Sequence, residues 1–131
     1  MTGPPSERLR ELGIVLPEPP APVGTYSPVV IEGGFAWVSG QIALQGGKVV
    51  HPGTVDASVG LEEAQEVARL AALQGLGALA SALGSLDRIR RVVRVAVYVA
   101  ASPGFDRISD VANGASGLLV EIFGEAGRPA R

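Results

Sequence analysis

The sequence contains no cysteine, and this absence excludes several kinds of structure and chemistry. Without thiols the chain has no disulfides, no thiolate catalysis and no cysteine-based metal site. Histidine is nearly as scarce, because the single His51 has no histidine partner and precedes Pro52. We therefore interpret His51 as a surface residue and assign no metal. A reducing compartment is harmless to such a chain, and we expect a cytoplasmic protein.

The chain also lacks a charge excess and a long apolar run. Its 11 basic and 13 acidic side chains give a formal net charge of −2, which offers no long-range attraction for phosphates. No apolar run approaches the roughly 20 residues that span a bilayer. The first residues lack the basic start and apolar stretch of a secretory signal. We therefore expect neither a membrane nor a nucleic acid as a partner.

Aromatic side chains are few, with one Trp, three Phe and two Tyr among 131 residues of which 47% are hydrophobic. This composition predicts a single domain with an aliphatic core. Residues 1–23 differ from the rest, since a short helix that Ser6 can cap and Gly13 can end is followed by a proline-rich connector. We expect this connector to lie over the surface, and residues 24–131 to form the folded domain.

Short extended segments are predicted in the first half of that domain. Residues 29–31 and 35–39 are joined by Gly33 and Gly34, a pair suited to a tight hairpin turn. A third short strand is predicted over residues 48–50. Between residues 89 and 99 the pattern has a period of two, which predicts a central strand that is apolar on both faces over its second half.

Two long helices are predicted around that strand. The first covers residues 61–83, with Gly60 as its cap and Gly84 as its stop, and the second covers residues 106–123 and ends at Gly124. We interpret the glycines inside both helices as close-packing positions, because they complete no phosphate-binding motif. The element order implies an α+β domain in which two helices pack on one face of a mixed sheet.

Three short motifs carry a resemblance to a known family. The run Phe35-Ala-Trp-Val-Ser-Gly-Gln ends an apolar segment at small polar groups, Gly24-Thr-Tyr-Ser precedes it, and Gly127-Arg-Pro-Ala-Arg closes the sequence. Together they resemble the RidA/YjgF family of reactive-intermediate deaminases, also labelled endoribonuclease L-PSP. The resemblance runs from Gly24 through Arg131, and the residues before it are typical of a branch with an N-terminal extension.

The resemblance implies a chorismate-mutase-like (bacillus-type) fold and a homotrimer whose ligand sites lie between subunits. It implies no cofactor. In the family pattern, Pro-Ala-Arg leads into a final strand pair and a glutamate near the water-binding position. Because this sequence ends on Arg131, we expect the C-terminal strands of the sheet, and that glutamate, to be missing.

The resemblance also assigns the site residues. It implies that Arg131 holds the carboxylate of a 2-imino or enamine acid through two parallel charge-assisted hydrogen bonds. Tyr26, Ser39 and Gly40 are expected to border the cleft, and Asn113 aligns approximately with an asparagine in the family's second helix. No remaining side chain is an obvious general acid or base.

Three functions remain open from the sequence. The leading hypothesis is cofactor-independent hydrolytic deamination of reactive 2-imino or enamine acids. The second is a noncatalytic trimer that binds small carboxylates, and the third is an endoribonuclease or translation inhibitor. Four arginines, Arg88, Arg90, Arg91 and Arg94, bear on the third. Alternation sends Arg91 to the opposite face from the others and no stacking aromatics are interleaved, so we favour an exposed strand face.

Overall fold

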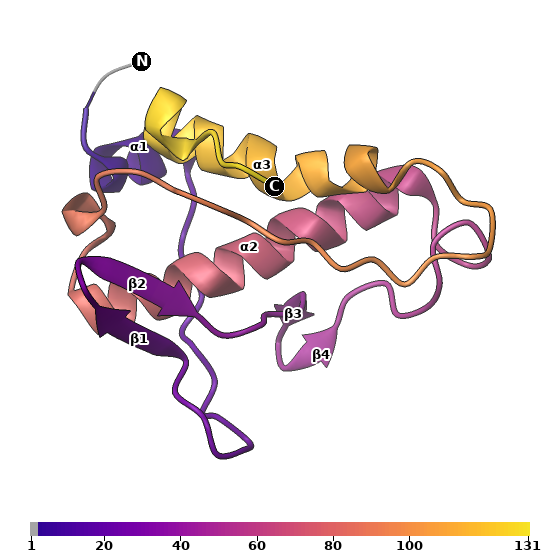
Figure 1. The fold of residues 1–131 in the computed structure, drawn as a ribbon, viewed down its shortest axis with the longest axis horizontal. Coiled ribbons are helices and arrows are strands. Elements are labelled where there is room, and N and C mark those ends of the chain that lie inside the picture. Colours follow the sequence, from indigo (N-terminus) through magenta and orange to yellow (C-terminus); the bar gives the residue numbers. More distant parts are fainter. Residues whose placement is uncertain (1–2) are drawn as a thin grey trace.

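Two long helices lie side by side in the computed structural model, which describes residues 3–131 (Figure 1). Helix α2 covers Leu61–Leu83 and helix α3 covers Ile108–Phe123. Both run from right to left in Figure 1, so the chain between them crosses back along the pair before α3 begins. The other elements pack on this pair of helices.

The predicted bounds of α2 are confirmed at both ends. Gly60 is its N-cap, and its backbone N–H donates to Glu63 Oε1 at 3.0 Å, which satisfies one of the amides that a helix start leaves open. Gly84 ends the helix with φ 86°, a left-handed conformation that glycine adopts without steric cost. One buried polar residue, Gln74, donates to the Leu44 carbonyl at 3.1 Å and so joins α2 to the strands beside it.

The second predicted helix is also found, with one shifted boundary. It ends before Gly124 as predicted, but it begins at Ile108 rather than at residue 106. The shift has a local cause, because the Phe105 N–H first closes a turn on the Ser102 carbonyl at 3.1 Å. The three-residue 3-10 helix η1, Leu86–Arg88, follows α2, and η2, Gly124–Gly127, follows α3.

A short N-terminal helix, α1, covers Pro5–Leu12, and the prediction that Ser6 caps it is wrong. Pro4 is the N-cap, because proline at the next position needs no backbone partner and lets the helix start earlier. Ser6 instead lies in the first turn, where its hydroxyl donates to Asp87 Oδ2 at 2.6 Å and its N–H donates to Oδ1 at 2.8 Å. Gly13 ends the helix with φ 68°, as predicted.

The strands form two small antiparallel pairs. Strands β1 (Val29–Glu32) and β2 (Phe35–Val38) make the predicted hairpin, with φ of 61° and 80° at Gly33 and Gly34. Strand β4 (Lys48–Val49) confirms the third predicted strand, and its partner β3 (Leu44–Gln45) was not predicted. A two-residue strand carries too little alternation to be recognised from sequence.

The predicted central strand over residues 89–99 is wrong as a regular strand. The segment is extended, but within the described residues it has one isolated bridge, from Arg94 to Ala130, and a second isolated bridge, from Ala101 to Val55, lies just beyond it; both are parallel. Regular strand structure requires a continuous ladder of backbone partners, and among the described residues this segment finds distant partners only at Val92, Val93 and Val95. The period of two is nevertheless expressed in its packing, since Val95, Val97 and Val99 are less exposed than the residues between them.

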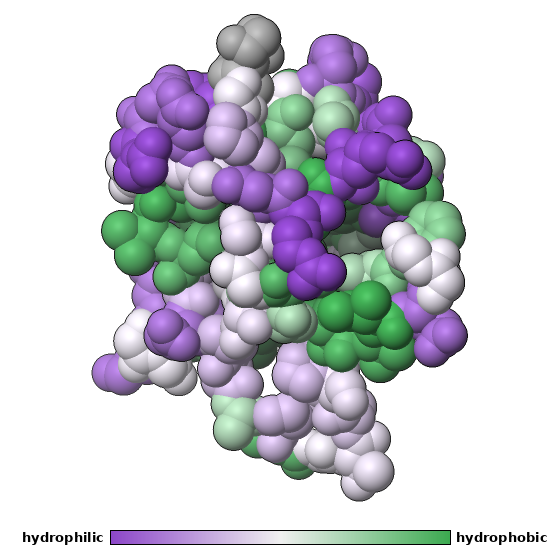
Figure 2. Space-filling view, turned by 90° about the vertical axis from the view of Figure 1, so that its left-hand side faces the viewer, coloured by the Kyte–Doolittle hydropathy of each residue, from purple (hydrophilic) through white to green (hydrophobic). Residues whose placement is uncertain are grey.

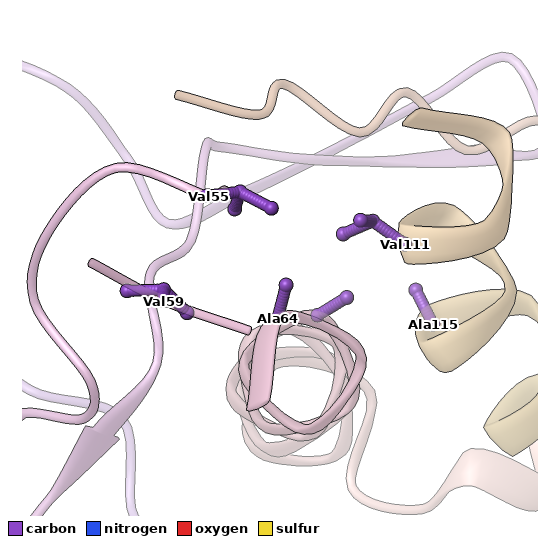
Figure 3. Close-up of a cluster of buried hydrophobic side chains, with 6 residues drawn as sticks. Val55, Val59, Ala64, Val111 and Ala115 are labelled. Carbon is purple, nitrogen blue, oxygen red and sulfur yellow. The ribbon is translucent and has the colours of Figure 1, made fainter. Parts of the chain in front are cut away.

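Two clusters of aliphatic side chains form the core between these elements. The first joins the chain before α2 to both helices, with Val55 and Val59 packed toward Ala64 of α2 and toward Val111 and Ala115 of α3 (Figure 3). In the second, α1 and the residues after it cover the other end of the helix pair. Its buried members are Leu76, Leu86, Leu118, Leu119, Ile122 and Phe123, and Leu9, Leu12, Ile14 and Leu16 pack against them.

Apolar side chains also lie on the surface. Viewed from the side on which the hairpin turn lies, hydrophilic residues gather mainly in the upper part, and hydrophobic patches lie near mid-height on the left and the right (Figure 2). On the hairpin, Val30 faces Trp37 across the two strands, and the Phe35 and Trp37 rings lie 6.2 Å apart. Within residues 3–131, none of the helices combines the length and the apolar content that crossing a bilayer requires.

Candidate functional site

Arg131 lies against the exposed face of α3, where three neutral side chains hold its guanidinium. Nη1 donates to Asn113 Oδ1 at 2.8 Å and to Ser116 Oγ at 3.4 Å, and Nη2 donates to Ser109 Oγ at 2.6 Å. These acceptors stand at helical spacings of four and three residues, so they share one face of α3. The structure thus brings Arg131 and Asn113 together, two of the residues predicted from the sequence.

The backbone before Arg131 fixes where its side chain can reach. The Ala130 N–H donates to the Val93 carbonyl at 3.0 Å, and the Val95 N–H donates to the Ala130 carbonyl at 2.9 Å. The tail is therefore paired with the extended chain between the helices. This pairing sets Arg131 beside α3.

A groove of about 470 Å³ opens beside the guanidinium of Arg131. Its floor is the face of α3 from Asn113 to Glu121, and Gly117, which has no side chain, leaves room in the middle. Val120 and Pro129 give the groove an apolar side. The residues that line it are Asn113, Ser116, Gly117, Val120, Glu121, Arg128, Pro129 and Arg131.

The other charged residues of this groove are already paired. Arg128 Nη2 lies 2.9 Å from Glu125 Oε1, and this hydrogen-bonded guanidinium holds the pKa of the Glu125 carboxyl below its ordinary value. Glu121 lies 2.7 Å from Arg69 Nη1. Arg131 differs from both arginines, because within residues 3–131 it has no carboxylate partner within ion-pair distance.

Tyr26, Ser39 and Gly40 lie together at the open end of the β1–β2 hairpin. The Ser39 hydroxyl donates to the Ser27 carbonyl at 2.6 Å, and its N–H donates to the Pro28 carbonyl at 2.9 Å, so Ser39 closes the hairpin next to the Tyr26 segment. Tyr26 is half exposed, and Gly40 has open space where a side chain would be. None of the three lines the groove beside Arg131.

The predicted site residues therefore fall into two groups within one chain. Arg131 and Asn113 belong to the α3 face, whereas Tyr26, Ser39 and Gly40 belong to the hairpin end. In Figure 1 the C-terminus lies beside α3, and the hairpin lies on the opposite side of α2. No hydrogen bond among the described residues joins the two groups.

The groove shows two functional candidates that the sequence analysis missed, Ser109 and Ser116. Both accept hydrogen bonds from Arg131. A signal for them existed, because residues 109, 113 and 116 form a neutral polar stripe on a helix that is otherwise mostly aliphatic. The sequence does not say that the chain terminus folds back onto that stripe, so the stripe alone is typical of any solvated helix face.

Two other candidates have ordinary structural roles. His51 lies 3.3 Å from Glu63 and 3.4 Å from Glu66 at the start of α2, and its side chain is partly exposed. Of the arginine cluster, Arg88 donates to the Leu83 carbonyl at 3.0 Å and Arg91 donates to the Arg128 carbonyl at 2.9 Å. Both guanidinium groups thus fix neighbouring chain segments.

Comparison with known proteins places this geometry in a family. Residues 6–131 match the family described as YjgF/chorismate mutase-like, putative endoribonuclease. Protein TCP17 of Trypanosoma cruzi is 44% identical over 124 residues, which cover 94% of this chain and 78% of TCP17. Both matches include the hairpin and most or all of α3, and so they span nearly the whole chain.

Two solved structures share the arrangement of helices and strands. One, described as a putative endoribonuclease from Shewanella oneidensis MR-1, has a TM-score of 0.89 and 34% identity, and the match covers 98% of this chain and 85% of that one. The other, a protein of unknown function from Agrobacterium tumefaciens, has a TM-score of 0.86 and 39% identity over 97% of this chain and 77% of that one. The predicted α+β class and chorismate-mutase-like fold are thereby confirmed, and the chain belongs to the YjgF family.

Proposed function

We propose that this chain hydrolyses reactive 2-imino and enamine acids without a cofactor and holds the substrate carboxylate on Arg131. One observation carries the proposal. Three neutral side chains orient the Arg131 guanidinium beside a groove of about 470 Å³, and among the described residues no carboxylate pairs with it. A fixed and unpaired guanidinium is the group that proteins use for two-point contact with a carboxylate.

The chemistry of a 2-imino acid suits this arrangement. Its carboxylate is bonded directly to the carbon of the carbon–nitrogen double bond, so a two-point contact with Arg131 also fixes that carbon. Water adds to the carbon and forms the carbon–oxygen bond. The carbon–nitrogen bond then breaks, ammonia leaves, and a 2-oxo acid remains. The gain in rate comes from orientation of the electrophilic carbon in a confined groove.

The shape of the groove favours a small organic acid. Gly117 leaves space next to the guanidinium, and Val120 and Pro129 offer an apolar surface to the substrate's side chain. Neither a phosphate cradle of backbone amides nor a run of cations is needed for such a ligand. The arrangement therefore supports small carboxylates over polyanions.

We further propose that the working protein is a homotrimer in which a neighbouring copy completes the site. Tyr26, Ser39 and Gly40 lie away from Arg131 within one chain, which supports a site built from two copies. The hairpin also exposes apolar side chains, with Trp37 62% and Phe35 52% exposed. Contiguous apolar surface of this kind is typical of protein–protein contacts.

The test is hydrolysis of 2-iminopropanoate. An amino-acid oxidase generates this compound from alanine in the assay mixture, and its disappearance is measured. Arg131→Ala is expected to lower kcat/KM by about 100-fold or more, because the substrate loses its orienting contact. Arg107→Ala is the matched control, since Arg107 flanks α3 and pairs with Asp110 outside the groove. Unchanged hydrolysis in the Arg131 variant would overturn the proposal.

A noncatalytic carboxylate-binding protein is the second candidate. Glu121 is the one carboxylate that lines the groove, and Arg69 pairs with it at 2.7 Å. A carboxylate held in an ion pair is not available as a general base, and this favours binding without turnover. Binding of pyruvate that requires Arg131, without turnover of 2-iminopropanoate, would select this function.

RNA cleavage is the third candidate, and the names of the family and of the Shewanella relative favour it. The formal charge of −2 and the engagement of Arg88 and Arg91 with backbone carbonyls oppose it. Cleavage of RNA that persists through rigorous purification, and that is lost on substituting Arg90 and Arg94, would promote this function above the deaminase.

A further inference from the structure

The arginines near α3 differ in what holds them. Arg69, Arg107 and Arg128 each pair with a carboxylate, at 2.7, 2.8 and 2.9 Å. Arg131, in the part of the chain that the structure describes, is held by an amide oxygen and two hydroxyls. A carboxylate partner orients a guanidinium and cancels its charge, whereas neutral acceptors orient it and leave the charge in place.

We propose that Ser109 and Ser116 are positioning residues, which hold Arg131 in a fixed orientation without neutralising it and so keep it ready for a substrate carboxylate. This inference rests on the function proposed for Arg131. Ser109 has the shorter contact, at 2.6 Å, and lies in the first turn of α3. Ser116 completes the set at 3.4 Å, two turns further along.

The number of donors supports this role. A guanidinium has five N–H donors, and three contacts to α3 leave two of them for a ligand. Two donors are what a carboxylate requires for a two-point contact. The Ser116 hydroxyl donates to the Ala112 carbonyl at 3.3 Å, so its hydrogen is directed into the helix and its oxygen is left to accept from Arg131.

The orientation also explains why α3 carries serine at these positions. An acidic residue at position 109 would pair with Arg131 and neutralise the positive charge that the substrate carboxylate needs. It would at the same time suit the helix, because negative charge in the first turn is favourable. Serine at position 109 forgoes the helix stabilisation that an acidic residue would provide, but it leaves the positive charge of Arg131 available. This trade is expected of a site selected for binding.

The decisive variant is Ser109→Asp, because it moves binding and stability in opposite directions. We expect the Kd for pyruvate and the KM for 2-iminopropanoate to rise at least about tenfold, since the new carboxylate competes for Arg131. The midpoint of thermal unfolding is expected to stay the same or rise. Unchanged binding constants would show that position 109 does not contact Arg131 in solution and would overturn the positioning role.

Ser81→Asp is the matched control, because Ser81 is an exposed serine on α2 that does not line the groove. It introduces the same charge and is expected to leave pyruvate binding unchanged. Should Ser109→Asp fail to fold, Ser109→Ala carries the test and must weaken pyruvate binding at least about threefold. In an Arg131→Ala background, Ser109→Asp must have no further effect on binding, because its target is gone.

The outcomes separate this inference from the proposed function. Wild-type protein that binds pyruvate but hydrolyses no 2-iminopropanoate, with binding lost in Ser109→Asp, supports the positioning role and overturns the deaminase. Protein that hydrolyses the imine equally well with and without Ser109→Asp overturns the positioning role alone. Wild-type protein that shows no binding to millimolar pyruvate by calorimetry overturns both.

Discussion

The α3 side of the molecule buries its apolar side chains, whereas the outer face of the β1–β2 hairpin exposes them. Leu118 and Ile122 of α3 have 0% exposure and contact α1, α2 and the chain between the helices. On the hairpin face, which we define as Val30, Phe35 and Trp37, each side chain is at least half exposed. One chain thus completes its own helical core and leaves the hairpin face uncovered.

This difference separates what folds a single chain from what assembles several. The helical core has buried partners from every element around it, so its stabilisation does not require another molecule. The hairpin face has no such cover, and the residues Tyr26, Ser39 and Gly40 belong to the same hairpin region. We infer that one assembly step both buries the hairpin face and brings these residues to a neighbour's Arg131.

The largest effect is expected from emptying the helical core. Leu118→Ala removes a fully buried side chain and is expected to lower the free energy of unfolding by about 2–5 kcal/mol at any protein concentration. Val30→Ala, on the hairpin face, is expected to cost less than about 1 kcal/mol in the isolated chain. Urea unfolding at several protein concentrations checks the contrast, because a loss that grows on dilution belongs to assembly.

The next effect concerns the close approach of α3 to α2. A side chain added at Gly114 would meet the backbone carbonyl of Gln65, so Gly114→Ala is expected to destabilise by about 1–3 kcal/mol. Gly117 is the matched position on the same helix, with open space around it. Gly117→Ala is expected to stabilise by up to about 1 kcal/mol through helix propensity. Equal unfolding midpoints for the two variants would contradict the close-packing interpretation.

A smaller effect is expected from breaking the hairpin face. Trp37→Ser should leave the helical core folded and shift the proposed homotrimer toward monomer, with a dissociation constant raised at least about tenfold. Light scattering after size-exclusion chromatography measures the mass. Val30→Ser and Val15→Ser form a matched pair, because Val15 is also exposed but lies outside the hairpin. If both valine variants shift the mass equally, the hairpin face is not the contact.

The sequence predicted those elements whose signals are local. Helix α2 was correctly bounded at both ends by Gly60 and Gly84, and the hairpin was correctly placed by Gly33 and Gly34. These positions are fixed by backbone conformations that glycine favours, so they can be recognised without knowing what packs around them. Gly114 was likewise correctly interpreted as a close-packing position, but the same interpretation is wrong for Gly117, which has open space around it.

The predictions that failed depended on partners distant in sequence. The segment 89–99 has the alternation of a strand, yet alternation cannot show whether a second strand supplies its backbone partners. Ser6 has the side chain of a helix cap, but its hydroxyl contacts Asp87, 81 residues away. Ser109 and Ser116 were missed because their partner, Arg131, lies 22 and 15 residues further along the chain, outside helix α3.

The smallest effect is expected at the contact between α1 and η1. The hydrogen bond from the Ser6 hydroxyl, followed by the one from its N–H, lowers the pKa of Asp87 below its ordinary value of 3.8. A group with a lowered folded-state pKa stabilises the fold above its unfolded pKa and loses that contribution as pH falls through the folded value. We therefore expect Ser6→Ala to be less stable than wild type at pH 7, and the difference to shrink below pH 3.8. Urea unfolding at pH 7 and at pH 2.5 measures it, and a difference that persists undiminished in acid would show that Ser6 stabilises α1 by another route.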